Sequence, residues 1–156
     1  MPDLITFGET CAVFVARNIG RMRYCRDFTI RPGGAEATVA VGARKLGIDS
    51  AWVSALGEDE MGHYVRGIVA AEQVDVSRVT MVRGKPTAVF LRERLPGGQA
   101  KHFYYRRGSA FSDYTPDMLD EDFIASARIL HLTGINPALS KSCDASAWRA
   151  IEIARA

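Results

Sequence analysis

The sequence lacks the features that mark several large classes of protein. It has 156 residues and only three cysteines, Cys11, Cys25 and Cys143, and no pair of them has C-x-x-C spacing. This argues against a disulfide scaffold and favours free thiols in a reducing compartment. No apolar run approaches the roughly 20 residues that span a bilayer. Residues 1–16 also lack the basic start of a signal peptide. We therefore expect a cytoplasmic protein with no membrane partner.

The sequence also has no block of like charge. Twenty basic and 18 acidic side chains give a net charge of +2, so nucleic acid is not expected as a partner. The most basic run, Arg17 to Arg26, contains four arginines and is predicted to be a solvated loop. The content of 47% hydrophobic and 24% charged residues is typical of one soluble globular domain.

Common catalytic and metal-binding signatures are missing as well. The sequence contains no G-x-x-x-x-G-K-[ST], G-x-S-x-G or H-E-x-x-H motif. Its three histidines, His63, His102 and His131, are far apart and have no ligand spacing. His131 lies inside the apolar stretch "ILHLTG", which predicts a core histidine with its hydrogen bonds satisfied. No metal site is therefore predicted.

What is present is an alternation of buried strands and helices. Apolar runs predict strands at 3–9, 50–57 and 127–134. Helical spacing predicts helices at 35–46, at 58–74 with Asp59 as a cap, and at 136–156 with Asn136 as N-cap. This order indicates an α/β fold with a three-stranded parallel sheet.

Four further segments read as half-polar strands that this sheet does not need. They cover about 11–16, 27–32, 87–95 and 101–107, and the last two form a hairpin around "PGGQ". We expect them to form a separate small β-sheet.

Two stretches are candidate binding sites. "PGGAEAT" places Gly33 and Gly34 before a helix, where backbone N–H groups are free to meet a polar ligand, although an ordinary turn gives the same pattern. In the hairpin, Phe90, Arg92 and Arg94 share one face of their strand, and Tyr104 and Arg106 share a face of the other. That face is either a solvated surface with aromatic filler or part of a ligand site.

The two stretches belong to a longer pattern. "RPGGAEATVAVGARKLG" followed by "ALGEDEMG" resembles the N-terminal signature of the ribokinase-like (PfkB) carbohydrate kinases. "LRERLPGGQAKHFYYRRGSA" and "ILHLTGINPALS" are more similar to 2-keto-3-deoxygluconate kinases than to ribokinases or fructokinases. The resemblance runs essentially from Leu4 to Ala156 and implies a ribokinase-like sheet flanked by helices, with the small sheet as a lid.

The resemblance also implies a set of sugar-binding residues. These are Gly34, Ala35, Glu36, Ala37, Thr38, Phe90, Tyr104, Arg106 and Ile135. In this interpretation Arg106 pairs with the carboxylate of a sugar acid, because burying an unpaired guanidinium costs several kcal/mol. Two positions depart from the family pattern: Thr38 stands where asparagine is usual, and Phe90 where tyrosine is common.

The catalytic part of the family pattern is missing from the sequence. The family's catalytic aspartate, anion hole and nucleotide pocket belong to a C-terminal half with a G-A-G-D motif, and no G-x-G-D occurs here. The last predicted helix also runs to Ala156 without a terminating glycine. We therefore expect residues 1–156 to be the N-terminal part of a kinase domain whose ATP-binding part is absent. No catalytic, cofactor or metal residue is assigned to the chain.

The function implied is ATP-dependent phosphorylation of 2-keto-3-deoxygluconate or a related sugar acid. ATP and Mg²⁺ are expected in the complete enzyme and not in this chain alone, which we expect to be inactive. A homo-oligomer through the lid is the expected assembly. The alternatives are a kinase for a neutral sugar of the fructose or ribose type and a non-catalytic module that binds sugar acids.

Overall fold

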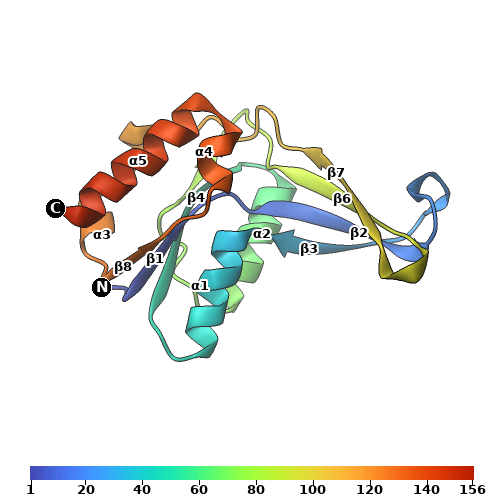
Figure 1. The fold of residues 1–156 in the computed structure, drawn as a ribbon, viewed down its shortest axis with the longest axis horizontal. Coiled ribbons are helices and arrows are strands. Elements are labelled where there is room, and N and C mark those ends of the chain that lie inside the picture. Colours follow the sequence, from blue (N-terminus) through green and yellow to red (C-terminus); the bar gives the residue numbers. More distant parts are fainter.

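The computed structural model describes all residues from 1 to 156 and contains two four-stranded sheets. The main sheet has the order β5-β4-β1-β8 and is parallel throughout. The second sheet has the order β3-β2-β6-β7 and extends sideways from the body (Figure 1). The strands of the main sheet are β1 (Leu4–Phe7), β4 (Ser50–Gly57), β5 (Val79–Val82) and β8 (Ile129–His131).

Helices cover both faces of the main sheet, as a parallel sheet requires (Figure 1). The helices are α1 (Ala35–Lys45), α2 (Glu60–Ala71), α3 (Glu121–Ala125), α4 (Ile135–Leu139) and α5 (Lys141–Arg155). Alternate residues of β4 go to opposite cores: Val53 packs with α3 and α5, and Trp52 packs with α1 and α2. The Trp52 indole N–H also donates to the Gly8 carbonyl oxygen (2.9 Å) and so secures the end of β1.

The second sheet is built from the four half-polar segments of the sequence. It contains β2 (Cys11–Ile19), β3 (Phe28–Gly33), β6 (Val89–Arg94) and β7 (Ala100–Tyr105). Strand β2 is antiparallel to β3 and parallel to β6, and β6 and β7 form the antiparallel hairpin. A short 3-10 turn at Pro96–Gly98 closes the hairpin, and two others lie at Met22–Tyr24 and Pro116–Met118.

Four sequence predictions are wrong. The main sheet has a fourth strand, β5, which pairs with the second half of β4. The helix predicted at 136–156 is two helices, and Ser140 caps the second by accepting a hydrogen bond from the Cys143 N–H (3.1 Å). Asn136 is not a cap, since it lies inside α4 and its amide donates to the Phe7 carbonyl. His131 is partly buried, and its Nε2 has no hydrogen-bond partner.

The cap predicted at Asp59 is confirmed and does more than begin a helix. Its carboxylate accepts from the Gly62 N–H, the Thr87 N–H and the Thr87 hydroxyl, at 2.7–2.8 Å. Thr87 stands just before β6, so this network joins α2 to the second sheet. Burial opposes ionisation of Asp59, but the hydrogen bonds from Thr87 and Gly62 outweigh it and lower its pKa.

Asp59→Ala should therefore lower the free energy of unfolding at pH 7 by about 0.5–2 kcal/mol, through loss of the cap. Because the pKa is lowered by folding, the carboxylate stabilises the fold above its unfolded pKa of about 3.9. That contribution is lost as the pH falls through the lower, folded value. Urea unfolding at pH 7 and pH 3 measures the free energy of unfolding of the variant and of the unmodified chain. The difference between the two should be smaller at pH 3 than at pH 7. Asp27→Ala removes an exposed carboxylate and is the control. If Asp59→Ala lowered the free energy of unfolding equally at both pH values, the ionised Asp59 carboxylate would not be the stabilising group.

Candidate functional site

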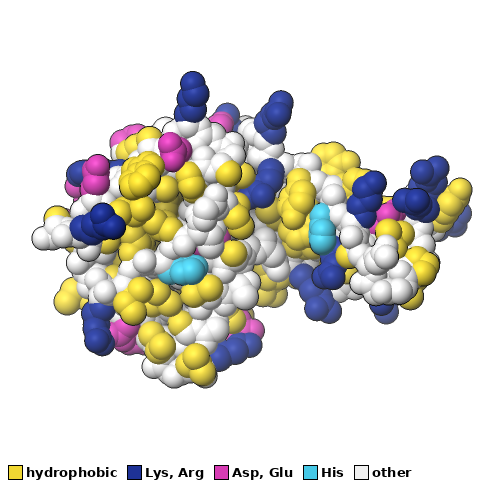
Figure 2. Space-filling view, viewed as in Figure 1, with side chains coloured by type: hydrophobic (Ala, Val, Ile, Leu, Met, Phe, Trp, Pro, Cys, Tyr) yellow, Lys and Arg dark blue, Asp and Glu magenta, His cyan; other side chains and the backbone are white.

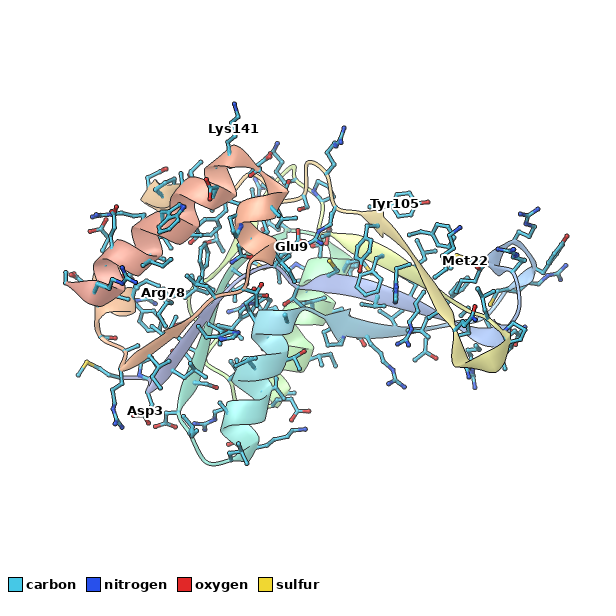
Figure 3. All side chains as sticks on the ribbon, in the orientation of Figure 1. Asp3, Glu9, Met22, Arg78, Tyr105 and Lys141 are labelled. Atoms are coloured by element: carbon cyan, nitrogen blue, oxygen red, sulfur yellow. The ribbon has the colours of Figure 1, made fainter.

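A hollow of about 500 Å³ lies where the main sheet meets the second sheet. Its lining comes from five places in the sequence: the β1–β2 connection, the start of α1, β6, the end of β7 and the start of α4. The lining residues are Glu9, Cys11, Gly33, Gly34, Ala35, Glu36, Thr38, Phe90, Tyr104, Arg106 and Ile135. Figure 3 labels Glu9, which lies at the junction of the two sheets.

Eight of the nine residues named from the sequence line this hollow. The exception is Ala37, which is buried and faces a smaller hollow of about 180 Å³ between α1 and α2. Helical geometry explains the exception, because successive residues of a helix point in different directions. The analysis of the sequence missed Glu9 and Cys11, and it placed Gly33 in a candidate stretch without listing it among the sugar-binding residues. The signal for Glu9 was its place just after a buried parallel strand, where open α/β sheets form ligand sites.

Gly34 lets α1 begin against the β1–β2 connection, and Gly33 lets the end of β3 lie close to Val13 of β2. A Cβ on Gly34 would meet the Thr10 hydroxyl and the Glu9 carbonyl oxygen, and one on Gly33 would meet the Val13 side chain. The backbone of Gly34 is extended (φ −162°), so the requirement is space and not an unusual backbone conformation. The close contact holds the amino end of α1 at the wall of the hollow.

Arg106 forms an ion pair across the junction of the two sheets. Its Nε and Nη2 lie 2.7 Å and 2.5 Å from Oε2 of Glu9, and the Ser109 hydroxyl donates to Oε1 (2.8 Å). The Glu9 side chain is buried, and the Arg106 side chain is about one-quarter exposed (26%). From the sequence we assumed that the Arg106 guanidinium has no partner within the chain and so needs the carboxylate of a sugar acid. That assumption is wrong, because Glu9 neutralises the guanidinium. A guanidinium has five N–H groups, so three remain for other partners.

Two aromatic rings form the wall of the hollow beside this ion pair. Phe90 and Tyr104 are opposite each other in the β6–β7 pairing, with ring centroids 4.9 Å apart. The guanidinium carbon of Arg106 lies 5.6 Å from the centroid of the Tyr104 ring, within cation–π range. Tyr104 is half exposed (54%), so part of its side chain is open to solvent.

The opposite side of the hollow is held by hydrogen bonds between α1 and α4. The buried Glu36 carboxylate accepts from the Thr133 hydroxyl (2.5 Å), which itself accepts from the Ile135 N–H (3.2 Å). The Thr38 hydroxyl donates back to the Gly34 carbonyl (2.7 Å), so only its acceptor capacity remains for a ligand. The hollow thus contains one guanidinium and two carboxyl groups.

Cys11 is held as a neutral thiol at the base of the hollow. Burial, and then the neighbouring charge of Glu9, raise its pKa to about 12. All three cysteines are free, but the neutral form of Cys11 is a poor nucleophile at physiological pH. No group of three or more His, Cys, Asp or Glu side chains is arranged to hold a metal. None of the helices is long and apolar enough to cross a membrane.

These observations define an α/β domain with a polar pocket between a parallel sheet and a smaller projecting sheet, the architecture of sugar kinases. The model of the pfkB family carbohydrate kinases matches residues 1–156, and the chain belongs to that family.

Curated relatives support the same membership. The chain is 37% identical to a 2-dehydro-3-deoxygluconokinase of Bacillus subtilis over 139 residues, which are 88% of this chain and 43% of the relative. It is 33% identical over 153 residues to a 2-dehydro-3-deoxygluconokinase of Thermoproteus tenax (96% of this chain, 47% of the relative). It is also 33% identical over 153 residues to a fructokinase of Solanum tuberosum (97% and 48%). The chain spans about half the length of these relatives.

Solved structures show the same fold. A PfkB protein from Polaromonas sp. superposes with a TM-score of 0.96 at 35% identity, over 99% of this chain and 52% of that one. A 2-dehydro-3-deoxygluconokinase from Thermotoga maritima superposes with a TM-score of 0.90 at 26% identity, over 97% of this chain and 47% of that one. The predicted fold class, a ribokinase-like parallel sheet with a small second sheet, is thus confirmed.

The close contact at Gly34 predicts that adding a single methyl group there destabilises the fold. Gly34→Ala should lower the free energy of unfolding by about 1–3 kcal/mol, because the new Cβ meets the backbone of Glu9. The matched control is Gly42→Ala, an exposed position inside α1 with nothing within 4 Å, which should stabilise the chain by about 0.5–1 kcal/mol. Urea unfolding of both variants measures the two effects. Equal changes in the free energy of unfolding at Gly34 and Gly42 would show that the close approach of Gly34 to Glu9 does not limit stability.

Proposed function

We propose that this chain supplies the sugar-binding part of an ATP-dependent kinase for 2-keto-3-deoxygluconate (2-dehydro-3-deoxygluconate) or a related sugar acid. The observation that carries the proposal is the guanidinium of Arg106, held by Glu9 against the Tyr104 ring at the wall of the pocket. An arginine held in this way has lost most of its conformational freedom before a ligand binds, which lowers the entropic cost of binding.

Each wall of the pocket suits one part of a sugar acid. The three N–H groups that Arg106 does not give to Glu9 can bind a carboxylate, with geometry that an ammonium group lacks. The first N–H groups of α1 have no partner within the helix and suit the hydroxyl oxygens of the sugar. The ring of Phe90 provides an apolar surface for the carbon chain.

In phosphoryl transfer this part of the enzyme would hold the acceptor hydroxyl in line and exclude water. The second sheet would act as a lid over the sugar, since it already forms one wall of the pocket. ATP supplies the phosphoryl group, and Mg²⁺ neutralises its charge. We assign both to a part of the enzyme that this chain does not include. We further propose that the lid sheet pairs two copies of the enzyme and that the enzyme is cytoplasmic.

A kinase for a neutral sugar is the second candidate, and one observation favours it. Glu9 already neutralises Arg106, and Glu36 adds another carboxyl group to the lining, so the pocket has no excess of positive charge. A fructokinase is also among the relatives of the chain. The charge of the preferred sugar is therefore the property to measure.

Arg106→Leu should separate the two candidates. Loss of charge-assisted hydrogen bonds to a carboxylate should weaken binding of 2-keto-3-deoxygluconate about tenfold or more, and that of fructose much less. Calorimetric titration of the purified chain with each sugar gives both affinities. Arg107→Leu is the control, because it removes an equal charge from an adjacent exposed residue that lies outside the pocket. Equal changes for both sugars, in a variant whose urea unfolding matches that of the unmodified chain, would favour the neutral-sugar candidate.

The chain by itself should not transfer phosphate. The purified 156-residue chain, incubated with ATP, Mg²⁺ and 2-keto-3-deoxygluconate, is expected to give no sugar phosphate, because the sequence contains no G-x-G-D motif. Transfer of labelled γ-phosphate measures this directly. Turnover by the purified chain would contradict the proposal. Binding of the sugar acid without turnover is expected both from the proposal and from a non-catalytic sugar-acid module. A thermal melt with and without the sugar acid separates the two, because only the complete module should be stable and soluble by itself.

A further inference from the structure

A second hollow, of about 420 Å³, lies farther out on the second sheet and is lined largely by arginine. Four of its seven lining residues are arginines, Arg17, Arg31, Arg92 and Arg94, and all four are exposed. Val15, Ala16 and Thr29 complete the lining. We call this the arginine groove. It shares no lining residue with the sugar pocket.

The register of the sheet brings these arginines together. Residues directly opposite in paired strands lie on the same face. Val15 of the central strand β2 is opposite Thr29 of β3 and Arg92 of β6, and Val13 is opposite Arg31. The pairs Val13–Phe90 and Phe90–Tyr104 place the wall of the sugar pocket on this same face. The groove is therefore an outward continuation of the pocket's face.

None of the four arginines has a carboxylate partner. The ten ion pairs of the structure involve none of them. The one hydrogen bond from these guanidinium groups runs from Arg94 to the Arg17 carbonyl oxygen (3.0 Å) and leaves the positive charge uncompensated. The nearest carboxylate in sequence, Glu93, is buried, and its place between Arg92 and Arg94 puts it on the other face of the strand.

The arginine groove is part of a larger basic region formed by the second sheet and its loops. Residues 11–34 and 87–107, which contain the second sheet, carry ten basic and two acidic side chains, although the whole chain has a net charge of only +2. Figure 2 shows the dark blue side chains gathered at the far end of that sheet. The sequence contains no block of like charge, but folding gathers basic side chains on one part of the surface.

Like charges held close together destabilise a fold unless a counter-charge is present. Four arginines around one small hollow, with a threonine hydroxyl beside them, present many N–H donors to the same space. Arginine is the side chain best suited to phosphate and carboxylate oxygens, since its fork binds two oxygens at once.

We propose that the arginine groove binds a compact anion with two or more negative charges, carried by phosphate or carboxylate groups. The anion would bridge β3, β2 and β6 and so stiffen the second sheet next to the sugar pocket. A small anion fits better than an acidic protein surface. The unpaired arginines line one hollow of about 420 Å³, which falls in the range of about 300–1,000 Å³ that is typical of small-molecule sites.

Calorimetric titration of the chain with pyrophosphate, and separately with citrate, tests the proposal. Both titrations are made at low ionic strength with sodium chloride as the matched control. At least one anion should bind saturably at one site, and its dissociation constant should rise with added salt. A response to pyrophosphate alone identifies a phosphate ligand, and one to citrate alone a polycarboxylate.

Two double variants distinguish binding of an anion in the groove from attraction by the net charge of the chain. Arg31→Gln with Arg92→Gln should weaken binding about tenfold or more, through lost charge-assisted hydrogen bonds. Arg66→Gln with Arg155→Gln removes the same charge from exposed, unpaired arginines outside the groove and should change the dissociation constant by less than about twofold. Thr29→Asp keeps every arginine but adds a competing carboxylate, and it should also reduce binding.

Three results would overturn the proposal. The first is no saturable binding of either anion at millimolar concentration. The second is equal weakening by the two double variants, which would show attraction by net charge alone. The third is salt-sensitive self-association of the chain that Arg31→Gln with Arg92→Gln abolishes, in place of anion binding, which would assign the groove to an acidic protein surface.

Discussion

The ion pair between Glu9 and Arg106 connects the two halves of this structure. Glu9 follows β1 of the main sheet and Arg106 follows β7 of the second sheet, so their contact sets how one sheet meets the other. The hydrogen bond from Ser109 and the packing of Tyr104 against the guanidinium keep both partners in place. Such a pair is costly to break from one side, because the remaining charge loses its partner in a partly buried place. The pocket exists where it does because this contact closes one of its sides.

The two sheets also differ in electrostatic character. The second sheet and its loops carry most of the excess positive charge, and the main body carries an excess of negative charge. Within the pocket between the two sheets the charges are nearly balanced, since Arg106 pairs with Glu9 and Glu36 adds a second carboxyl group, whereas the arginines of the groove farther out have no acidic partner. One sheet face therefore offers two electrostatic environments, one in which the arginine is paired with a carboxylate and one in which the arginines are unpaired.

The prediction of the fold from the sequence succeeded where the local signals were strong. Asp59 and the helical spacing after it placed α2 correctly, and the glycine loop at Pro96–Gly98 placed the hairpin. It failed where packing overrode a local signal. The tetrapeptide of β5 is too short to stand out, and it is a strand because β4 offers it an edge. The sequence Asn136-Pro137 is typical of a helix start, but the Asn136 amide instead bonds to Phe7 in β1, and the helix breaks at Ser140.

The sequence alone determined the alternation of strands and helices, the glycine pair before α1 and the aromatic-arginine face of the hairpin. These follow from interactions between near neighbours and from the repeat of each element. Only the tertiary structure decided that Glu9 neutralises Arg106, that Ala37 turns away from the pocket, and that four arginines from three strands surround one groove. The partners of the Glu9–Arg106 pair are 97 residues apart in the chain. No local pattern encodes such a meeting, because it depends on how the two sheets pack together.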